Sequence, residues 1–335
     1  MPATPPHDAH SPRTAFAHGE GWPHEPVRPH IPRDRNEAML VLSETRRVRL
    51  TNLGMPFWPA LGITKAALIQ YYLDVAPLLL PHLAGRAMVM KRYPNGVAGK
   101  FFVMKRAPTP RPSWVETCAI EQASGGGVSD FPVVNDAAAL AWIVNLGCID
   151  LHPWYARCDE VHRPDYLHFD LDPGHADFER VREAGLVVHE ALTALHMPSY
   201  VKTSGSRGLH VYVPIVRGPD QNQVSELTRS LARSLEGQHP RLVTAEVRVA
   251  SRSAERVLID YKQNAWGRTL ASVYSLRPTP RATVSAPITW SELEAGVMID
   301  DFRIDTMPSR LKALGDLWSA VAPDEGGRFD LGSLL

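Results

Sequence analysis

One stretch, residues 167–174 with the sequence LHFDLDPG, constrains the fold more than any other. Leu167, Phe169 and Leu171 alternate with His168, Asp170 and Asp172, which is the pattern of a strand with one apolar and one polar face. Two carboxylates then share a face about 7 Å apart at their Cα atoms, and Pro173-Gly174 ends the strand. The strand is therefore either a hard-oxygen site for Mg²⁺ or Mn²⁺, or a surface edge kept soluble by two acids.

The composition places the chain among soluble globular proteins. Its 335 residues, 44% of them hydrophobic, suffice for one large domain or two closely joined lobes. No apolar run reaches the length of a membrane span and no signal peptide pattern opens the chain, so we expect a soluble, cytoplasmic protein without membrane contact. Cys118, Cys148 and Cys158 lack the spacing of a disulfide framework or zinc site, which predicts free thiols in a reducing compartment.

The charge is balanced overall but uneven along the chain. No acidic residue lies between Asp74 and Glu116, while basic and aromatic side chains alternate there. The basic residues are Arg86, Lys91, Arg92, Lys100, Lys105, Arg106 and Arg111, and the aromatic ones are Tyr93, Phe101, Phe102 and Trp114. Cations that neutralise phosphates beside rings that stack on bases predict a groove for single-stranded or terminal DNA; a solvated basic face over core aromatics is the alternative.

The remaining pattern predicts alternating helices and strands after a tail. Residues 1–35 hold eight prolines and five histidines and predict a disordered segment, with folded structure from about Leu40. Caps at Thr64 and Asp136 predict two helices, the second ending at Gly147. Apolar periodicity predicts a third over 177–196 and a fourth over 221–235, with Gly237 as its stop. Predicted strands cover 47–51, 87–92, 100–105, 131–134, 199–203, 209–215, 244–249 and 256–260, and 151–154 predicts a proline-fixed corner containing His152.

Two further motifs carry chemistry. Residues 202–210, KTSGSRGLH, form a small-residue turn in which Ser204, Arg207 and His210 would suit phosphate oxygens, unless the turn is merely a tight hairpin. Asp260 ends the apolar run VLID and could join Asp170 and Asp172. Three carboxylates can bridge two divalent ions about 4 Å apart, which would activate a 3′-hydroxyl and stabilise a pyrophosphate leaving group.

The order of these motifs resembles the archaeo-eukaryotic primase superfamily, and more narrowly the polymerase domain of bacterial ligase D. The resemblance covers about residues 45–320. It rests on HxDxDP, SGSRGLHVYVPI and IDYKQN, together with LTN at 50–52, GITKAALIQYY at 62–72, KRYPNG at 91–96, NLG at 145–147, LHPW at 151–154 and YSLR at 274–277. It implies an α/β primase-polymerase fold with mixed or antiparallel central sheets, an RRM-like catalytic core and flanking helices.

The resemblance also implies roles for individual residues. Asp170, Asp172 and Asp260 would be catalytic and bind two divalent cations, Mn²⁺ or Mg²⁺. The incoming nucleotide would be held by Lys91, His152, Ser204, Arg207, His210, Gln263 and Arg277. DNA would be contacted by Lys65, Arg92, Phe101 and Phe102, the two phenylalanines facing the template base.

The chain departs from the family at two positions. Arg207 stands where lysine is common, which keeps the charge but replaces a flexible ammonium with a planar fork. Met55 stands where relatives carry a lysine that, with the lysine at position 65, grips a 5′-phosphate, so this preference should be weaker. The segment from Arg252 to Arg256 lacks the family's glycine, and its cations are not aligned.

The implied organisation is a tail (1–38), a catalytic domain (39–325) and a second tail (326–335). The domain would comprise an N-terminal lobe (39–150), a metal and nucleotide core (151–290) and a helical segment (291–325), as a stand-alone protein without a ligase site.

The implied activity is template-directed addition of ribo- or deoxynucleotides at gaps, overhangs or primers in DNA repair and end joining. The expected protein is a nucleoid-associated monomer that uses NTPs or dNTPs and works with Ku and a separate ligase. Two other hypotheses are a DNA-end-binding scaffold with vestigial catalysis and a glycosyltransferase using Asp-x-Asp; the latter leaves Asp260 and the basic hairpin unexplained.

Overall fold

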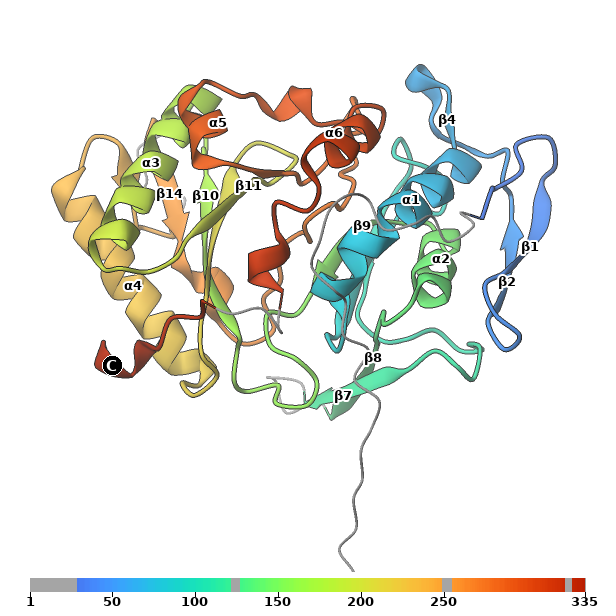
Figure 1. Ribbon diagram of the computed structural model, residues 1–335, viewed down its shortest axis with the longest axis horizontal. Helices are drawn as coiled ribbons and strands as arrows, with labels where there is room; N and C mark the ends of the chain where they lie inside the picture. The colour runs from blue at the N-terminus through green and yellow to red at the C-terminus, as the bar shows by residue number, and fades with distance from the viewer. Residues whose placement is uncertain (1–28, 122–126, 249–254, 323–326, 335) are drawn as a thin grey trace, which may run out of the picture.

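The computed structural model describes residues 29–121, 127–248, 255–322 and 327–334 (Figure 1). Its helices are α1 (Lys65–Leu83), α2 (Ala137–Asn145), α3 (Phe178–Ala194), α4 (Gln221–Gln238), α5 (Trp290–Glu294) and α6 (Met307–Leu314). Its strands are β1 (Glu37–Val41), β2 (Arg47–Thr51), β3 (Pro56–Trp58), β4 (Ile63–Thr64), β5 (Met88–Arg92), β6 (Phe102–Met104), β7 (Thr117–Glu121), β8 (Val128–Pro132), β9 (Cys148–Pro153), β10 (Tyr166–Asp172), β11 (Tyr200–Thr203), β12 (Leu209–Pro214), β13 (Val243–Thr244), β14 (Val257–Asp260) and β15 (Pro287–Ile288). This mixed α/β architecture confirms the predicted fold class.

A six-stranded sheet in the order β13-β14-β10-β12-β11-β15 forms the C-terminal half, and only the β13–β14 pair is parallel. Helices α3 and α4 cover one face of it (Figure 1). An added Cβ at Gly185 of α3 would lie 3.0 Å from Leu209, so the helix packs closely on the apolar face that also presents Leu171. The predicted alternation in β10 is therefore confirmed, and the polar positions lie on the opposite face of the sheet.

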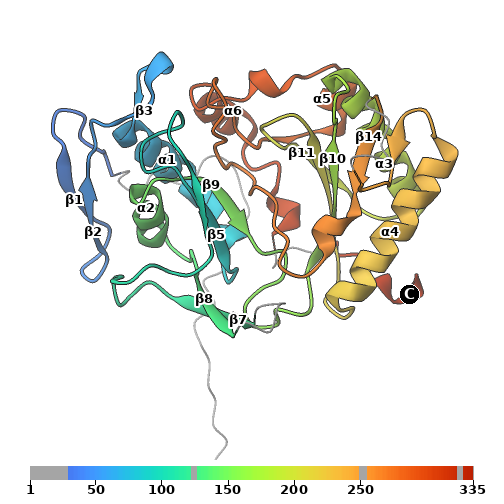
Figure 2. The ribbon, with the colours of Figure 1, turned by 180° about the vertical axis from the view of Figure 1, so that it is seen from behind.

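The N-terminal half is built on a three-stranded sheet, β6-β5-β9, with helices α1 and α2 packed against one another beside it (Figure 2). Three two-stranded units, β1-β2, β3-β4 and β7-β8, lie around it. The predicted turn between β5 and β6 holds Gly96 at φ +74°, and a Cβ there would lie 2.8 Å from the Pro56 carbonyl oxygen. The turn thus requires glycine for both its backbone conformation and its packing.

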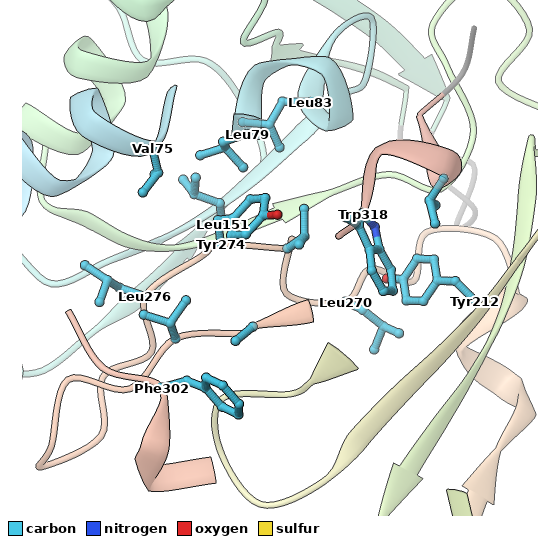
Figure 3. Close-up of a cluster of buried hydrophobic side chains, with 14 of the residues drawn as sticks. Val75, Leu79, Leu83, Leu151, Tyr212, Leu270, Tyr274, Leu276, Phe302 and Trp318 are labelled. Atoms are coloured by element: carbon cyan, nitrogen blue, oxygen red, sulfur yellow. The ribbon is translucent and has the colours of Figure 1, made fainter. Parts of the chain in front are cut away.

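One continuous hydrophobic core connects the two halves. Its buried residues run from Ile31 to Leu331. Figure 3 shows the junction, where Leu79 of α1 and Leu151 of β9 approach Tyr274, and Trp318 lies beside Tyr212 of β12. The rings of Tyr212 and Trp318 meet edge to face at 5.2 Å. Because both sheets contribute to the same core, the polar face of the six-stranded sheet is held at a fixed distance from the N-terminal half.

The predicted helix starts are confirmed by their caps. The side chains of Thr64, Asp136 and Asp177 each accept a hydrogen bond from the backbone N–H three residues later. The predicted end of the fourth helix is wrong, because α4 continues through Gly237 to Gln238. A glycine inside a helix costs only about 1 kcal/mol, which the continuing hydrogen bonds and packing can offset.

Other predicted boundaries also need correction. His152 does not occupy a proline-fixed corner: it lies in β9 and pairs with Val89 of β5, and Pro153, the last residue of the strand, pairs with Met88. The ordered chain begins before Leu40, because Ile31 is buried and its N–H donates to Gln70. Strand β13 is only Val243–Thr244, and residues 1–28 and 249–254 lie outside the described parts.

The expectation of three free thiols is wrong for two of them. Cys118 of β7 and Cys158 form a disulfide with their Cα atoms 5.9 Å apart, whereas Cys148 is a buried thiol. Forty residues separate the pair in sequence, so spacing alone gave no sign of it. The fold brings them together because the β7-β8 hairpin packs beside the segment that follows β9, around Trp154.

Among the described residues, no helix is both long and apolar enough to cross a membrane.

Candidate active site

A row of four polar side chains crosses the central sheet. Asp170 of β10 pairs with Asp260 of β14 on one side and with His210 of β12 on the other. His210 in turn pairs with Lys202 of β11. Directly opposed residues have neighbouring side chains, so acid, acid, imidazole and ammonium succeed one another on the face away from α3. Asp172 follows two residues after Asp170 on that face.

The carboxylates in this row repel one another. Burial, together with the charges of Asp260 and Asp172, raises the pKa of Asp170 to about 7. His210 Nε2 lies 3.4 Å from Asp170 Oδ1, and burial followed by the charge of Lys202 lowers the pKa of His210. At neutral pH the site therefore holds a neutral imidazole beside crowded acids, an arrangement that a bound cation would stabilise.

Asp172 and Asp260 also have local hydrogen-bond partners. Asp172 accepts a hydrogen bond from the Gly174 N–H at 3.0 Å, and Asp260 accepts from the Lys262 N–H at 3.1 Å and from Gln263 Nε2 at 2.8 Å. Within the described ranges, no three Asp, Glu, His or Cys side chains form a ready group of metal ligands. The donor chemistry nevertheless fits Mg²⁺ or Mn²⁺, because hard carboxylate oxygens that repel one another are the ligands those ions prefer.

The 204–208 turn is held from several sides. Ser204 Oγ accepts from the N–H groups of Ser206 at 3.2 Å and Gly208 at 3.0 Å, so this hydroxyl shapes the turn itself. Gly205 has φ +66°, and a Cβ at Gly208 would lie 2.1 Å from the Leu171 carbonyl oxygen. The turn is thus pressed against the end of β10, next to Asp172.

All residues predicted to bind the nucleotide line one cavity of about 270 Å³. They are Lys91, His152, Ser204, Arg207, His210, Gln263 and Arg277, and Asp170 and Asp172 line it as well. Asp260 does not, although Gln263 connects it to the wall. Arg207 reaches back to donate to the Gly174 carbonyl at 3.1 Å, and Arg277 donates to the Ser204 carbonyl. Segments from both halves of the molecule therefore meet at the cavity.

Sequence reasoning missed Asp150, which connects three of these residues. Its Oδ1 lies 2.8 Å from His152 Nε2 and 3.3 Å from Arg277 Nε, and its Oδ2 lies 3.5 Å from Lys91 Nζ. Burial would raise the pKa of Asp150, but the neighbouring His152, Arg277 and Lys91 outweigh it and hold that pKa well below its usual range. Strand alternation could have identified Asp150, since it lies two residues before His152 on the same face.

Lys202 was also missed. It is 1% exposed, and its Nζ lies 2.6 Å from His210 Nδ1 while donating to the Ala271 carbonyl at 2.9 Å and to Ser285 Oγ at 2.7 Å. Burial and the charge of Arg277 lower its pKa well below the ordinary value. The three contacts fix the ammonium and thereby the orientation of the His210 ring.

The four predicted DNA contacts lie outside the cavity, on and beside the β5-β6 hairpin. Phe101 and Phe102 are 55% and 41% exposed; Phe101 stacks on Tyr93 and Arg92 lies 5.0 Å above the Phe102 ring. Lys65 Nζ donates to the Thr51 carbonyl at 2.7 Å, and burial together with the nearby Arg92 lowers its pKa to about 8. Arg256, at the end of the unaligned segment, lies 3.3 Å from Glu236, and 252–254 are outside the described ranges.

Comparison with known proteins places this geometry in a family. Residues 64–318 match the family described as LigD, primase-polymerase domain. The multifunctional non-homologous end joining protein LigD of Mycolicibacterium smegmatis is 37% identical over 281 residues, which are 83% of this chain and 36% of that protein. The bifunctional non-homologous end joining protein LigD of Bacillus subtilis is 30% identical over 256 residues, covering 75% of this chain and 40% of that protein.

A solved structure agrees with these matches. The polymerase domain from Mycobacterium tuberculosis ligase D in complex with DNA has a TM-score of 0.78 at 30% identity, and the alignment covers 84% of this chain and 100% of that chain. The chain spans 36% to 40% of the length of the two curated relatives above. The chain therefore belongs to the LigD primase-polymerase domain family, and it is a nucleotidyltransferase of the primase-polymerase kind.

Proposed function

We propose that the protein is a template-directed polymerase that extends primers and fills gaps and overhangs during DNA end joining. The observation that carries this proposal is one cavity lined both by five cationic or imidazole side chains, Lys91, His152, Arg207, His210 and Arg277, and by Asp170 and Asp172. A nucleoside triphosphate needs both features, since its phosphates require cations and its transfer requires acids that bind metal. The relatives named above act in non-homologous end joining, and the solved relative binds DNA.

The residues of the chain divide the work of nucleotide binding. Arg277, fixed by Asp150 and the Ser204 carbonyl, presents its charge to the phosphates from one wall, and Arg207 does so from the turn on the other. His210, held by Lys202, offers a neutral ring nitrogen rather than a full charge. Ser204 and Gly208 keep the turn tight against β10, so that these groups stay close to Asp170 and Asp172.

Asp170, Asp172 and Asp260 would hold two divalent cations, Mn²⁺ or Mg²⁺. Their carboxylates fit such ions chemically, and the raised pKa of Asp170 is the electrostatic sign of a site that a cation would stabilise. Bound divalent cations supply charge neutralisation at the attacking 3′-hydroxyl and at the pyrophosphate leaving group. Because Asp260 lies beside Asp170 in the sheet, a rigid strand pair would position both ligands.

The DNA would lie along the β5-β6 hairpin. Exposed Phe101 and Phe102 would contact the template base, Lys65 would bind a 5′-phosphate, and Arg92 would contact the DNA beside Phe102. We further propose that the protein acts as a monomer in the nucleoid-associated cytoplasm and that Ku and a separate ligase are its partners. The division into an N-terminal lobe ending at residue 150, a catalytic core (151–290) and a C-terminal segment (291–325) is part of the same proposal, with the lobe including Ile31 and β1 rather than beginning at residue 39.

A primer-extension assay tests this proposal. The protein is supplied with Mn²⁺ or Mg²⁺ and with NTPs or dNTPs on gapped, overhanging and unprimed templates. We expect template-complementary addition at gaps and overhangs. DNA binding without incorporation under every condition would instead indicate a DNA-end-binding scaffold with vestigial catalysis.

A further inference from the structure

A second, larger cavity of about 730 Å³ lies on the flank of the molecule, between the β7-β8 hairpin and the loop after β14. We call it the flank groove and define it by Lys105, Arg106, Glu121, Trp154, Trp266 and Arg268. The loop that supplies Trp266 and Arg268 continues directly into Thr269–Ala271, which line the catalytic cavity. Figure 2 shows the β7-β8 hairpin below β5 of the three-stranded sheet, near the segment that follows β14.

The charges of the flank groove suit a phosphate backbone. Lys105, Arg106 and Arg268 are all exposed, and Glu121 is the single acid among the described lining residues. Three cations against one carboxylate favour a polyanion, and one acid is too few to hold the metal of a second nucleoside triphosphate.

The aromatic residues of the flank groove suit unpaired bases. The Trp266 ring is stacked on His162 at 4.7 Å with an interplanar angle of 17°, and it meets Trp154 edge to face at 5.1 Å. Trp154 is itself buried and contacts Phe131 at 5.8 Å. The Trp266 indole is thus fixed from two sides while lining the cavity, and rigid aromatic rings next to cations are the platforms on which single-stranded nucleic acids stack.

The flank groove continues the predicted path of the template. Strand β6 carries Phe102, and Lys105 and Arg106 come directly after the strand ends at Met104. A strand that passes Phe101 and Phe102 therefore meets the groove cations at the other end of β6. The volume lies within the range of about 300–1,000 Å³ in which small-molecule sites fall, enough for one or two nucleotides.

We propose that the flank groove binds one or two unpaired nucleotides of the template strand beyond the templating base, with Trp266 as the stacking platform and Arg106 and Arg268 as phosphate partners. This rests on the proposed function, because it requires a DNA template in the catalytic cavity. It extends the DNA-binding surface that the sequence predicts at Lys105 and Arg106 to Trp266 and Arg268, which the sequence did not single out as a site.

Fluorescence anisotropy with labelled primer-templates tests the proposal. Two DNAs differ only in the unpaired template arm, which is two or eight nucleotides long. The test variants are Trp266→Ala, Trp266→Phe and the double variant Arg106→Ala with Arg268→Ala. Trp290→Ala is the matched control for the first, since Trp290 also stacks on a histidine, His189, at 4.0 Å. Arg229→Ala with Arg233→Ala on α4 is the control for the charges.

We expect the wild type to bind the long arm at least fivefold more tightly than the short arm. Trp266→Ala and the double variant Arg106→Ala with Arg268→Ala should remove most of this affinity difference, while their affinity for the short arm stays within twofold of wild type. Trp266→Phe and both controls should retain the difference. The arginine pair should also reduce the salt slope of long-arm binding by about 1.4, since each single-strand phosphate contact contributes about 0.7.

Equal binding of both arms by the wild type, or an equal loss on both arms in the variants, would overturn the assignment. Single-nucleotide incorporation on the short-arm template separates this outcome from failure of the proposed function. Nucleotide incorporation without an affinity difference between the two arms would overturn the flank-groove proposal alone. An affinity difference without incorporation would overturn the catalytic proposal and leave the flank-groove proposal standing.

Discussion

At the scale of single residues, a buried carboxylate explains how a protein without net charge holds several basic side chains close together at the catalytic cavity. Asp150 is 1% exposed and faces Lys91, His152 and Arg277, so one carboxylate holds three side chains that would otherwise repel one another. The buried Asp150 carboxylate does not line the cavity itself. It fixes the positions of Lys91, His152 and Arg277, which do.

Replacing Asp150 tests this positioning. Asp150→Asn keeps the shape but leaves Lys91 and Arg277 without their buried counter-charge, and hydrogen bonds to charged groups contribute about 1.5–3 kcal/mol. We expect the KM for nucleotide to rise by roughly tenfold or more, with kcat changed less than about threefold, measured by steady-state incorporation. Asp165→Asn is the control. Asp165 is buried and lies 2.7 Å from Arg86, and neither residue lines the catalytic cavity. An equal KM change in both variants would contradict a specific role for Asp150.

The raised pKa of Asp170 predicts that the free energy of unfolding depends on pH in the absence of divalent cations. Its pKa of about 7 in the folded protein lies above the ordinary 3.8, so the folded state binds the extra proton and stability falls as pH rises from about 4 to about 7. Asp170→Asn removes this loss, and each pKa unit corresponds to about 1.4 kcal/mol. The variant should therefore be more stable than wild type by about 1–3 kcal/mol at pH 8 and nearly equal at pH 4. Urea unfolding measures this, with Glu226→Gln on α4 as the control; a less stable Asp170→Asn at pH 8 would contradict the repulsion.

Met55, which stands where relatives carry a lysine, predicts weaker binding of 5′-phosphates. Its carbonyl accepts from the Lys65 N–H at 2.8 Å, so a side chain at 55 lies near the retained lysine. Met55→Lys should increase the preference for 5′-phosphorylated over unphosphorylated gaps by roughly three- to tenfold, because an added phosphate contact strengthens binding. Competition binding with the two gaps measures it. An unchanged ratio would show that position 55 does not face the phosphate.

At the scale of elements, the site depends on how closely the 204–208 turn approaches β10. Gly208→Ala would place a Cβ 2.1 Å from the Leu171 carbonyl oxygen, next to the Leu171–Leu209 strand pair. We expect a loss of about 1–3 kcal/mol or more of unfolding free energy, measured by urea denaturation, as in overpacked sites. Gly218→Ala, with nothing within 4 Å of its Cβ, should stay within about 1 kcal/mol of wild type. Similar losses in both would contradict a special need for glycine at 208.

The elements also separate what the sequence could predict from what it could not. Cap chemistry predicted the starts of α1 and α2, apolar periodicity predicted α3, and alternation predicted the polar face of β10, because all three signals are local. The sequence predicted the wrong end for α4, a corner instead of a strand at His152, and free thiols at Cys118 and Cys158. Each of these features depends on packing between segments that are distant in the sequence. The short strands β1, β3, β7 and β15 carried no local pattern strong enough to be predicted.

At the scale of the whole molecule, one core fixes the cavity between two sheets. Arg277 and His152 come from the side of β9 and the loop after β14, while Asp170 and Arg207 come from the six-stranded sheet. The sequence predicted these residues through motif order, but their convergence depends on the packing around Tyr274 and Trp318 (Figure 3). Asp150 and Lys202 went unnoticed because a buried charge is understood only when its partners are in place.

Single-nucleotide incorporation by wild type, Asp170→Asn and Asp172→Asn in Mn²⁺ tests the central claim most directly. Both variants should lose incorporation by about 1,000-fold or more, because the metal-binding acids supply transition-state stabilisation. Their affinity for the same primer-template should stay within about threefold of wild type, and Glu226→Gln should behave as wild type. Incorporation retained by either variant at near wild-type rate would contradict the assignment of this acid pair as the catalytic centre.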